Sequence, residues 1–301
     1  MDDTELYRVG KEHEKWLIDL GTISINCWNF SDDEALRYIT DLISTSIKEN
    51  GVTYYRQDQN IWLHVFFDKA DKDYYNNRQG FCENHYITNK YKFLDTLKAE
   101  NPGLMIDNCA SGGRRLDLEM AKRSIPIWRS NYNCDPHDDL HEATQSQTLG
   151  LSCWLPMSGT MSYLGNKYEA MTSIIPCQVD TFSSPESEWY DMFTKLRYEM
   201  AENFYPLMCG GYDADKYLAM QYSSFDANEG FAVVYKREMI TDNSTVLKLN
   251  GLEENVTYVV KDFLSDSVLT EAVGLQLMEN GVSVNLTENP DAAVINFAVK
   301  K

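Results

Sequence analysis

The sequence has no long apolar run, and no stretch approaches the roughly 18 residues that a membrane-spanning helix needs. Its first residues, Met1-Asp-Asp-Thr-Glu5, include neither the basic nor the apolar segment of a secretory signal. Both absences argue against membrane insertion and export. We therefore expect a cytoplasmic protein with no membrane partner.

Paired cysteines and clustered histidines are also missing. The seven cysteines, an odd number, are scattered at wide spacings with no Cys-x-x-Cys pair. This pattern is typical of free thiols in a reducing compartment, rather than of a disulfide framework or a structural zinc site. His137 and His141 have the spacing that places two side chains on one helical face, but this spacing is common in proteins that bind no metal. We expect no metal site.

Basic residues are few relative to acidic ones. Lys and Arg number 27 against 46 Asp and Glu, which gives a formal net charge of −19. Such a surface repels phosphate backbones and anionic lipid headgroups. We therefore expect no nucleic-acid partner.

The sequence does contain enough apolar residues for a sizeable core. Of its 301 residues 43% are apolar, and the length suits one large domain or two smaller ones. Short strand signals alternate with helix signals in the first part of the chain, which indicates an α/β fold with a parallel sheet. The expected strands cover 52–58, 104–108, 126–131 and 151–156, with a weaker one at 173–177, and the expected helices cover 31–50, 86–100, 116–123, 141–149 and 189–208. Ser31 is the expected cap of the first helix, because Glu34 completes a capping box with it.

The pattern changes after about Gly210. Short β-rich runs at 231–235, 246–249, 256–260 and 293–297 are separated by turns such as Asn250-Gly251 and Asn280-Gly281. This spacing is typical of an antiparallel β module. We therefore predict two domains, covering residues 1–210 and 211–301.

Polar side chains stand at the ends of three of the expected strands and in the residues just after them. They lie in Arg56-Gln-Asp-Gln-Asn60, in Asp107-Asn-Cys-Ala-Ser-Gly-Gly-Arg-Arg115 and in Trp128-Arg-Ser-Asn-Tyr132. The carboxyl ends of parallel strands meet at one edge, and β/α-barrel enzymes carry their catalytic residues there. These segments therefore predict an active site.

Asp58 is the candidate nucleophile. Arg56 can keep its carboxylate ionised, and Asn60 can hydrogen-bond a ligand hydroxyl. Taken alone, an aspartate at such a position is more often the cap of the next turn. The small-residue turn that begins at Cys109 allows a ligand to approach the backbone. The competing interpretation makes Cys109 a core thiol.

Taken together, the three segments resemble the catalytic core of the family 36 glycoside hydrolases, the bacterial α-galactosidases, over about residues 5 to 205. The resemblance implies a partial (β/α)8 TIM barrel, about strands four to eight, followed by a small antiparallel β-sandwich domain. It implies a nucleophilic Asp58 and a sugar-binding site that includes Arg56, Asn60, Cys109, Ser111 and Gly112. No cofactor is implied, because displacement by two carboxylates needs neither metal nor nucleotide.

The chain departs from the family pattern at Asn131. The resemblance places the catalytic acid/base, an aspartate in the family, at this position. An amide cannot donate or accept the catalytic proton, and general acid/base catalysis typically contributes about 10²- to 10⁴-fold. Asn131 is therefore either a substitution that traps bound substrate or a natural impairment.

Trp154 lies near the end of the expected strand 151–156, which makes it a candidate for stacking on a sugar face. A buried tryptophan beneath the barrel rim is the interpretation that its position favours. We keep it as a substrate-binding candidate with that alternative open.

The resemblance also implies that the first three barrel strands lie upstream of Met1. An opened barrel exposes two sheet edges, which favour aggregation unless another chain covers them. A second copy of this chain or a complementing chain is the expected cover.

Three functions follow. The favoured one is a retaining hydrolase of terminal α-galactosides or their oligosaccharides, incomplete upstream or impaired at its acid/base position. The second is an α-N-acetylgalactosaminidase or galactosaminidase of the same family. The third is a non-catalytic carbohydrate-binding or partner-dependent chain.

Overall fold

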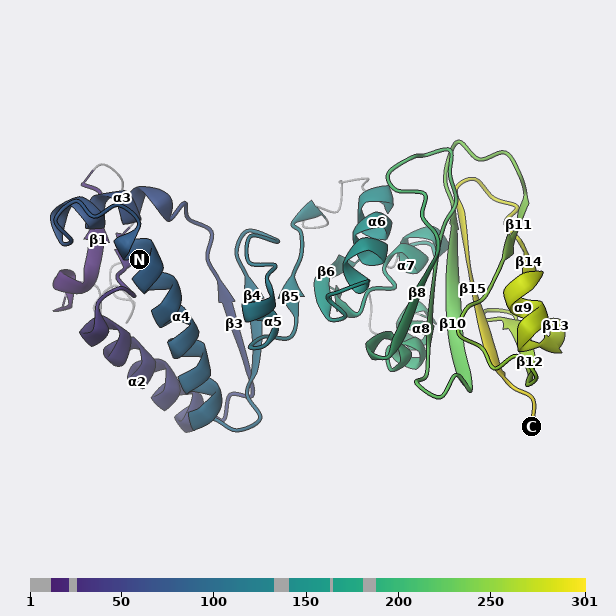
Figure 1. Cartoon of the computed structure of the whole chain (residues 1–301), viewed down its shortest axis with the longest axis horizontal. Coiled ribbons are helices and arrows are strands. Elements are labelled where there is room, and N and C mark those ends of the chain that lie inside the picture. The colour runs from purple at the N-terminus through teal and green to yellow at the C-terminus, as the bar shows by residue number, and fades with distance from the viewer. Residues whose placement is uncertain (1–11, 22–25, 133–140, 163–164, 181–187) are drawn as a thin grey trace. The chain divides into compact units, whose positions relative to one another are not determined.

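The computed structural model describes residues 12–21, 26–132, 141–162, 165–180 and 188–301. They form two compact units, Met1–Ile125 and Pro126–Lys301, which are described separately (Figure 1). Within these ranges, none of the helices has the length and apolarity that a bilayer crossing requires.

The first unit carries two parallel strands and the helices that flank them. Its elements are η1 (Glu14–Trp16), β1 (Leu17–Asp19), β2 (Asn26–Trp28), α2 (Asp33–Asn50), β3 (Tyr54–Asp58), α3 (His64–Asp73), α4 (Phe81–Glu100), β4 (Met105–Cys109) and α5 (Leu118–Ala121). Strands β1 and β2 form an antiparallel pair, and β3 and β4 form a parallel pair. The long helices α2 and α4 pack side by side (Figure 1).

Helix α2 begins one residue later than the sequence predicts. Its cap is Asp32, whose Oδ1 accepts hydrogen bonds from the backbone N–H groups of Glu34 and Ala35 at 2.8 and 2.9 Å. The predicted cap Ser31 is wrong, because its hydroxyl is hydrogen-bonded instead to Asn29 and, at 2.8 Å, to the Tyr75 hydroxyl. A long-range contact has thus replaced the local one.

The register of β3 and β4 decides which side chains share a face. Arg56 pairs with Asp107, and Asp58 pairs with Cys109. Because side chains alternate along a strand, these four residues lie on one face of the pair. The opposite face packs on α4, where the Tyr55 and Phe93 rings are 6.3 Å apart.

The second unit begins with further α/β structure. Its elements are β5 (Ile127–Trp128), α6 (His141–Ser152), β6 (Ser158–Ser162), α7 (Lys167–Thr172), β7 (Cys177–Asp180), α8 (Glu188–Leu196) and η3 (Glu199–Ala201). Strands β5, β6 and β7 pair in parallel, in that order. Two predictions are wrong here: residues 151–156 are not a strand, because α6 continues to Ser152, and the helix expected over 189–208 ends at Leu196.

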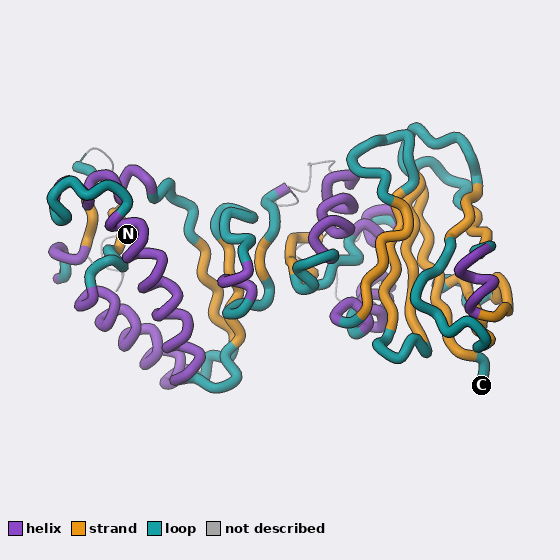
Figure 2. Tube along the Cα trace, viewed as in Figure 1, coloured by secondary structure: helices purple, strands orange, loops and turns teal. Residues whose placement is uncertain are grey.

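An antiparallel part completes the unit. It contains β8 (Asn203–Met208), β9 (Leu218–Ser223), β10 (Glu229–Lys236), β11 (Ser244–Leu247), β12 (Thr257–Asp262), β13 (Val268–Val273), α9 (Gly274–Glu279), β14 (Val282–Asn285) and β15 (Asp291–Val299). Six of these strands form one sheet in the order β13-β12-β15-β10-β9-β8, and β11 pairs with β14. Figure 2 shows the long strands of this sheet in orange near the C-terminus.

Strand β10 is continuously apolar from Phe231 to Tyr235 because its sheet is buried on both faces. Ala232 and Val234 belong to the core shared with β11 and β14, whereas Phe231, Val233 and Tyr235 pack with residues of α7 and α8. Burial on both faces replaces the usual alternation of apolar and polar residues by a continuous apolar run.

The order of a parallel sheet followed by an antiparallel sheet confirms the predicted fold at this level. How many strands of a barrel are present stays a prediction. The predicted boundary at 210/211 lies inside the second unit, close to β8, where the antiparallel sheet begins. That boundary also stays a prediction.

Candidate active site

Asp58 is the last residue of β3, and Arg56 lies two residues before it on the same face. The Arg56 Nη2 atom is 3.8 Å from the Asp58 Oδ2 atom, and both side chains are about one third exposed, at 36% and 35%. The guanidinium of Arg56 and the carboxylate of Asp58 therefore face each other at the end of the strand, and both are in contact with solvent.

Arg56 is itself held by a second carboxylate, that of Asp107. Arg56 Nη1 donates to Asp107 Oδ2 at 2.5 Å, and the Tyr54 hydroxyl donates to the same oxygen at 2.9 Å. Burial lowers the pKa of Arg56, but the hydrogen bond and charge of Asp107 outweigh this effect, so that the pKa is raised. Asp107 is only 2% exposed, and its Oδ1 atom has no hydrogen-bond partner among the described residues.

Asp107 lies in one of the three segments that predict the site, but it was not predicted to be a catalytic or binding residue. The signal that could have found it is strand register. Asp107 lies two residues before Cys109, as Arg56 does before Asp58, so that parallel pairing places it beside Arg56.

Cys109 ends β4 opposite Asp58 and is buried. Burial raises the pKa of its thiol, and the neighbouring Asp58 carboxylate raises it further, whereas the Gly112 backbone lowers it. The thiol therefore stays protonated at neutral pH beside the Asp58 carboxylate. The carbonyl of Cys109 accepts a hydrogen bond from the Gln59 N–H at 3.2 Å, which ties the two strand ends together.

Asn60 and Ser111 join the loops that follow β3 and β4. Asn60 Oδ1 accepts hydrogen bonds from the Ser111 backbone N–H at 3.0 Å and from the Ser111 hydroxyl at 2.8 Å. Ser111 and Gly112 have positive φ angles of 49° and 85°. Glycine adopts this conformation at little cost, and serine does so only under constraint. The Asn60 contacts supply that constraint, so these three predicted residues form one structural group.

A polar network supports the strand ends from the helix side. Arg115 Nη1 donates to Asn108 Oδ1 at 2.6 Å and its Nη2 donates to Gln59 Oε1 at 3.3 Å. Gln59 Nε2 in turn donates to the Tyr86 hydroxyl at 3.0 Å. Burial lowers the pKa of Arg115 and raises that of Tyr86 above its usual range. The network fixes Gln59, the residue next to Asp58.

Asn131 lies in the second unit, three residues beyond Trp128 of β5. The Trp128 Nε1–H donates to Asn131 Oδ1 at 3.1 Å, and Asn131 is exposed whereas Trp128 is buried. An aspartate at this position could accept the same bond. That Asn131 lies close to Asp58 stays a prediction.

Trp154 does not lie at a strand end. It follows α6, where its N–H donates to the Leu151 carbonyl at 3.0 Å, and it precedes β6. Because β5 and β6 are parallel, the start of β6 lies at the edge opposite to the end of β5, which Asn131 follows. Trp154 is 46% exposed, so the interpretation as a buried tryptophan is also wrong. We do not retain it as a substrate-binding residue.

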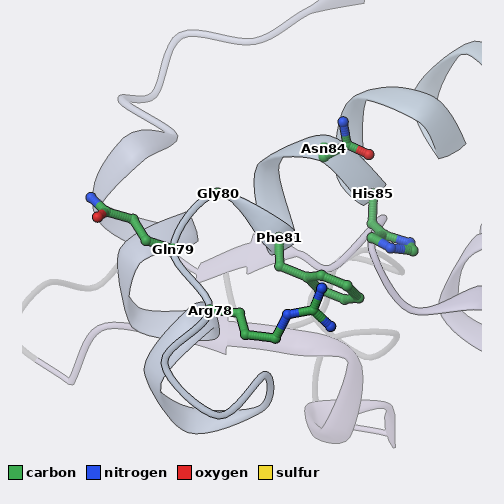
Figure 3. A pocket seen from close by; sticks show the side chains of 6 residues that line it. All are labelled: Arg78, Gln79, Gly80, Phe81, Asn84 and His85. Atoms are coloured by element: carbon green, nitrogen blue, oxygen red, sulfur yellow. The ribbon is translucent and has the colours of Figure 1, made fainter.

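The described ranges contain no cluster of three or more His, Cys, Asp or Glu side chains that could hold a metal ion, and His137 lies outside those ranges. An open hollow of about 360 Å³ lies at the start of α4, lined by Arg78, Gln79, Gly80, Phe81, Asn84 and His85. Figure 3 shows the Arg78 guanidinium beside the Phe81 ring, 4.4 Å from its centre.

Comparison with known proteins places this geometry in context. The family model described as Melibiase matches residues 3–161. The "Probable alpha-galactosidase C" of Aspergillus flavus is 24% identical over 314 residues, which cover 94% of this chain and 38% of that protein. The "Alpha-galactosidase" of Escherichia coli is 27% identical over 175 residues, which cover 55% of this chain and 22% of that protein.

Solved structures show the same fold. The alpha-galactosidase from Lactobacillus brevis has a TM-score of 0.79 at 18% identity, covering 100% of this chain and 43% of that one. A variant of the GH36 alpha-galactosidase AgaA from Geobacillus stearothermophilus, in complex with raffinose, has a TM-score of 0.78 at 18% identity, covering 99% of this chain and 43% of that one. The chain thus spans about two fifths of the length of the Aspergillus flavus protein and of these two solved structures.

Proposed function

The chain belongs to the Melibiase family, and from this premise we propose that it carries the nucleophile of a retaining hydrolase of terminal α-galactosides, in a form impaired at its acid/base position. The observation that carries the proposal is the charge arrangement at the ends of β3 and β4. Asp58 is accessible and ion-paired with Arg56, and Arg56 is anchored by the buried Asp107. Such an arrangement presents an ionised carboxylate in a fixed direction, as nucleophilic catalysis requires.

The proposed reaction has two displacements. An Asp58 oxygen attacks the anomeric carbon, a carbon–oxygen bond forms, and the bond to the leaving oxygen breaks. Water then hydrolyses the glycosyl ester and regenerates the Asp58 carboxylate. Arg56 stabilises the anion before attack, and the Cys109 thiol lies beside it as a neutral neighbour.

The leaving oxygen needs a proton in the first step, and Asn131 cannot give one. We therefore expect sugars with aryl or fluoride leaving groups, which need little protonation, to react better than raffinose-type oligosaccharides. Equal loss on both classes of substrate would contradict the assignment of Asn131 to the acid/base position.

Replacement of Asn131 tests the proposal directly. Asn131→Asp should raise the hydrolysis rate of raffinose by about 10²- to 10⁴-fold, and that of an aryl α-galactoside by less. The bond from Trp128 Nε1 can hold the new carboxylate where the amide oxygen lies now. The double variant Asp58→Asn, Asn131→Asp is the control and should return the rate to background.

Asn131 also favours a second function. With an amide where the proton donor is expected, the chain can retain an α-galactoside without turning it over. If Asn131→Asp binds raffinose and methyl α-galactoside but hydrolyses neither raffinose nor an aryl α-galactoside, the chain is a carbohydrate-binding protein rather than an impaired hydrolase.

A further inference from the structure

Three successive contacts join the chain segments that follow β3 and β4. The first pairs Asp58 with Cys109 at the strand ends. The second consists of the hydrogen bonds between Asn60 and Ser111. The third places the Arg114 guanidinium 4.2 Å from the centre of the Trp62 ring. The second and third contacts lie progressively further from Asp58 along both loops. The third contact has no role in the reaction proposed above.

The third contact is at the surface. Trp62 is 65% exposed, and its ring meets the His64 ring edge to face at 6.1 Å. A tryptophan carries a large apolar area, and leaving most of it in water forgoes the gain from burial. A cation–π contact at an exposed site is worth only about 0.5–1 kcal/mol. The stability of the two loops therefore gives little reason for an exposed indole here.

We propose that Trp62 and Arg114 form the binding surface for the sugar unit that leaves, the aglycone of an α-galactosyl oligosaccharide. This inference rests on the proposed function, because it takes Asp58 as the nucleophile. A nucleophile attacks the face of the anomeric carbon opposite to the leaving group, so the aglycone lies away from Asp58. The loops that hold Asp58 and Cys109 lead to Trp62 and Arg114 over four and five residues respectively.

The two side chains match the chemistry of a sugar ring. An indole offers a flat apolar face for the C–H groups of one sugar face, and a guanidinium offers several donors for the hydroxyls at its edge. The net charge of −19 disfavours a nucleic-acid base as the occupant of this aromatic surface. A neutral oligosaccharide carries no charge that this field would repel.

The test compares two ligands on the full 301-residue chain and three of its variants. Methyl α-galactoside carries the galactose unit alone, and raffinose adds the aglycone sugars; affinity is measured by titration calorimetry, and contacts by saturation-transfer NMR. Raffinose should bind more tightly than methyl α-galactoside, and saturation of the aromatic protons of the protein should be transferred to the aglycone protons of raffinose.

Trp62→Ala should weaken the binding of raffinose about five- to tenfold and leave the affinity for methyl α-galactoside unchanged. Arg114→Met, which keeps an apolar stem, should weaken raffinose less.

The matched control is Trp154→Ala, which removes another exposed tryptophan from a different part of the fold and should change neither affinity. Equal affinities for the two ligands, or a Trp62→Ala variant that still binds raffinose as the unmodified chain does, would overturn this inference alone. Equal weakening of both ligands in Trp62→Ala would also overturn it, because Trp62 would then act on the galactose unit or on the fold. Absence of binding of both ligands to the unmodified chain would overturn the proposed function together with this inference.

Discussion

Arg56 is the residue on which the geometry of the site depends, because it contacts a buried carboxylate and an exposed one. Asp107 holds it at 2.5 Å, and Asp58 meets its other nitrogen at 3.8 Å. We therefore propose that the buried Asp107 is a positioning residue, which acts on Asp58, the proposed nucleophile, through Arg56.

Asp107→Asn should slow covalent reaction at Asp58 without unfolding the chain. The amide keeps the shape of the side chain but weakens a charge-assisted hydrogen bond worth about 1.5–3 kcal/mol, so the labelling rate of Asp58 by an activated fluorosugar should fall about 10- to 100-fold. Asp95→Asn is the control, because Asp95 forms an exposed ion pair with Arg123 away from the strand ends. Labelling of Asp107→Asn at the rate of the control would show that Asp107 does not position Arg56.

Lys90 is a second residue with a measurable consequence. Its side chain is buried, its Nζ atom has no hydrogen-bond partner among the described residues, and it lies 5.0 Å from the centre of the Phe30 ring. Burial lowers its pKa well below the usual range, and the charge of Arg115 lowers it further. The folded chain therefore holds Lys90 without its proton at pH values where the unfolded chain still binds it.

Lys90→Met should stabilise the chain, because it replaces a buried unsatisfied donor whose cost is about 1–3 kcal/mol. The sign of the pH effect follows from the same shift. Between the lowered pKa and the usual lysine pKa of about 10.4, the unfolded state binds more protons, so stability rises with pH. The free energy of unfolding in urea, measured from pH 7 to 10, should show this rise in the unmodified chain. In Lys90→Met the part of the rise that comes from Lys90 should be absent. Lys98→Met, at an exposed position of the same helix, should behave as the unmodified chain does.

At the scale of elements, the predictions succeed where neighbouring residues in the sequence define a strand or helix. They fail where a residue distant in the sequence supplies the stabilising contact. Strands β3 and β4 begin and end within two residues of their predicted positions, because apolar runs with polar endings define them. Helix α3 and the first turn of α4 were not predicted. Neither helix has a side-chain cap at its own N-cap residue, Leu63 or Gly80. The missing cap of α4 comes instead from Asp71 of α3, whose carboxylate accepts from Gly80 N–H at 2.6 Å and from Cys82 N–H at 2.7 Å.

Asp71→Ala should therefore destabilise the first unit by about 1–3 kcal/mol, since it removes the acceptor for two buried or half-buried N–H groups. The free energy of unfolding from urea titration is the measurement. Asp73→Ala is the matched control on the same helix, because it removes only an exposed ion pair with Lys69 and should cost about 0.5 kcal/mol or less. Equal effects of the two substitutions would refute the capping role of Asp71.

Trp154 illustrates the same limit at the candidate site. An apolar run with a following proline has the composition of a short buried strand as well as of a helix end, and periodicity does not separate the two. The structure shows the end of α6 and a turn, which places Trp154 toward the edge of the sheet opposite to the one where Asn131 follows β5. In contrast, Asn60, Ser111 and Gly112 were predicted from their positions after strands, and the hydrogen bonds between Asn60 and Ser111 bring them together.

At the scale of the whole molecule, the family prediction is confirmed. Three polar strand endings, at about Asp58, Cys109 and Asn131, carried the resemblance, and the family model covers all three. The fold persists at TM-scores of 0.75 to 0.79 with identities of 17% to 19%. The strand order and the buried core thus tolerate extensive substitution. The distance between two side chains that lie far apart in the sequence, such as Asp58 and Asn131, depends instead on tertiary packing, which their spacing in the sequence does not specify.

The central claim is that Asp58 is a working nucleophile, and covalent trapping tests it most directly. The purified 301-residue chain is incubated with 2-deoxy-2-fluoro-α-galactosyl fluoride, in which the carbon–fluorine bond breaks as the carbon–oxygen bond forms, and fluoride departs without acid catalysis. We predict one added fluorogalactosyl group by intact mass, located on the peptide that contains Asp58 and absent from Asp58→Asn. A chain that unfolds cooperatively, and is therefore folded, but gains no mass or carries the sugar on another residue would contradict the claim.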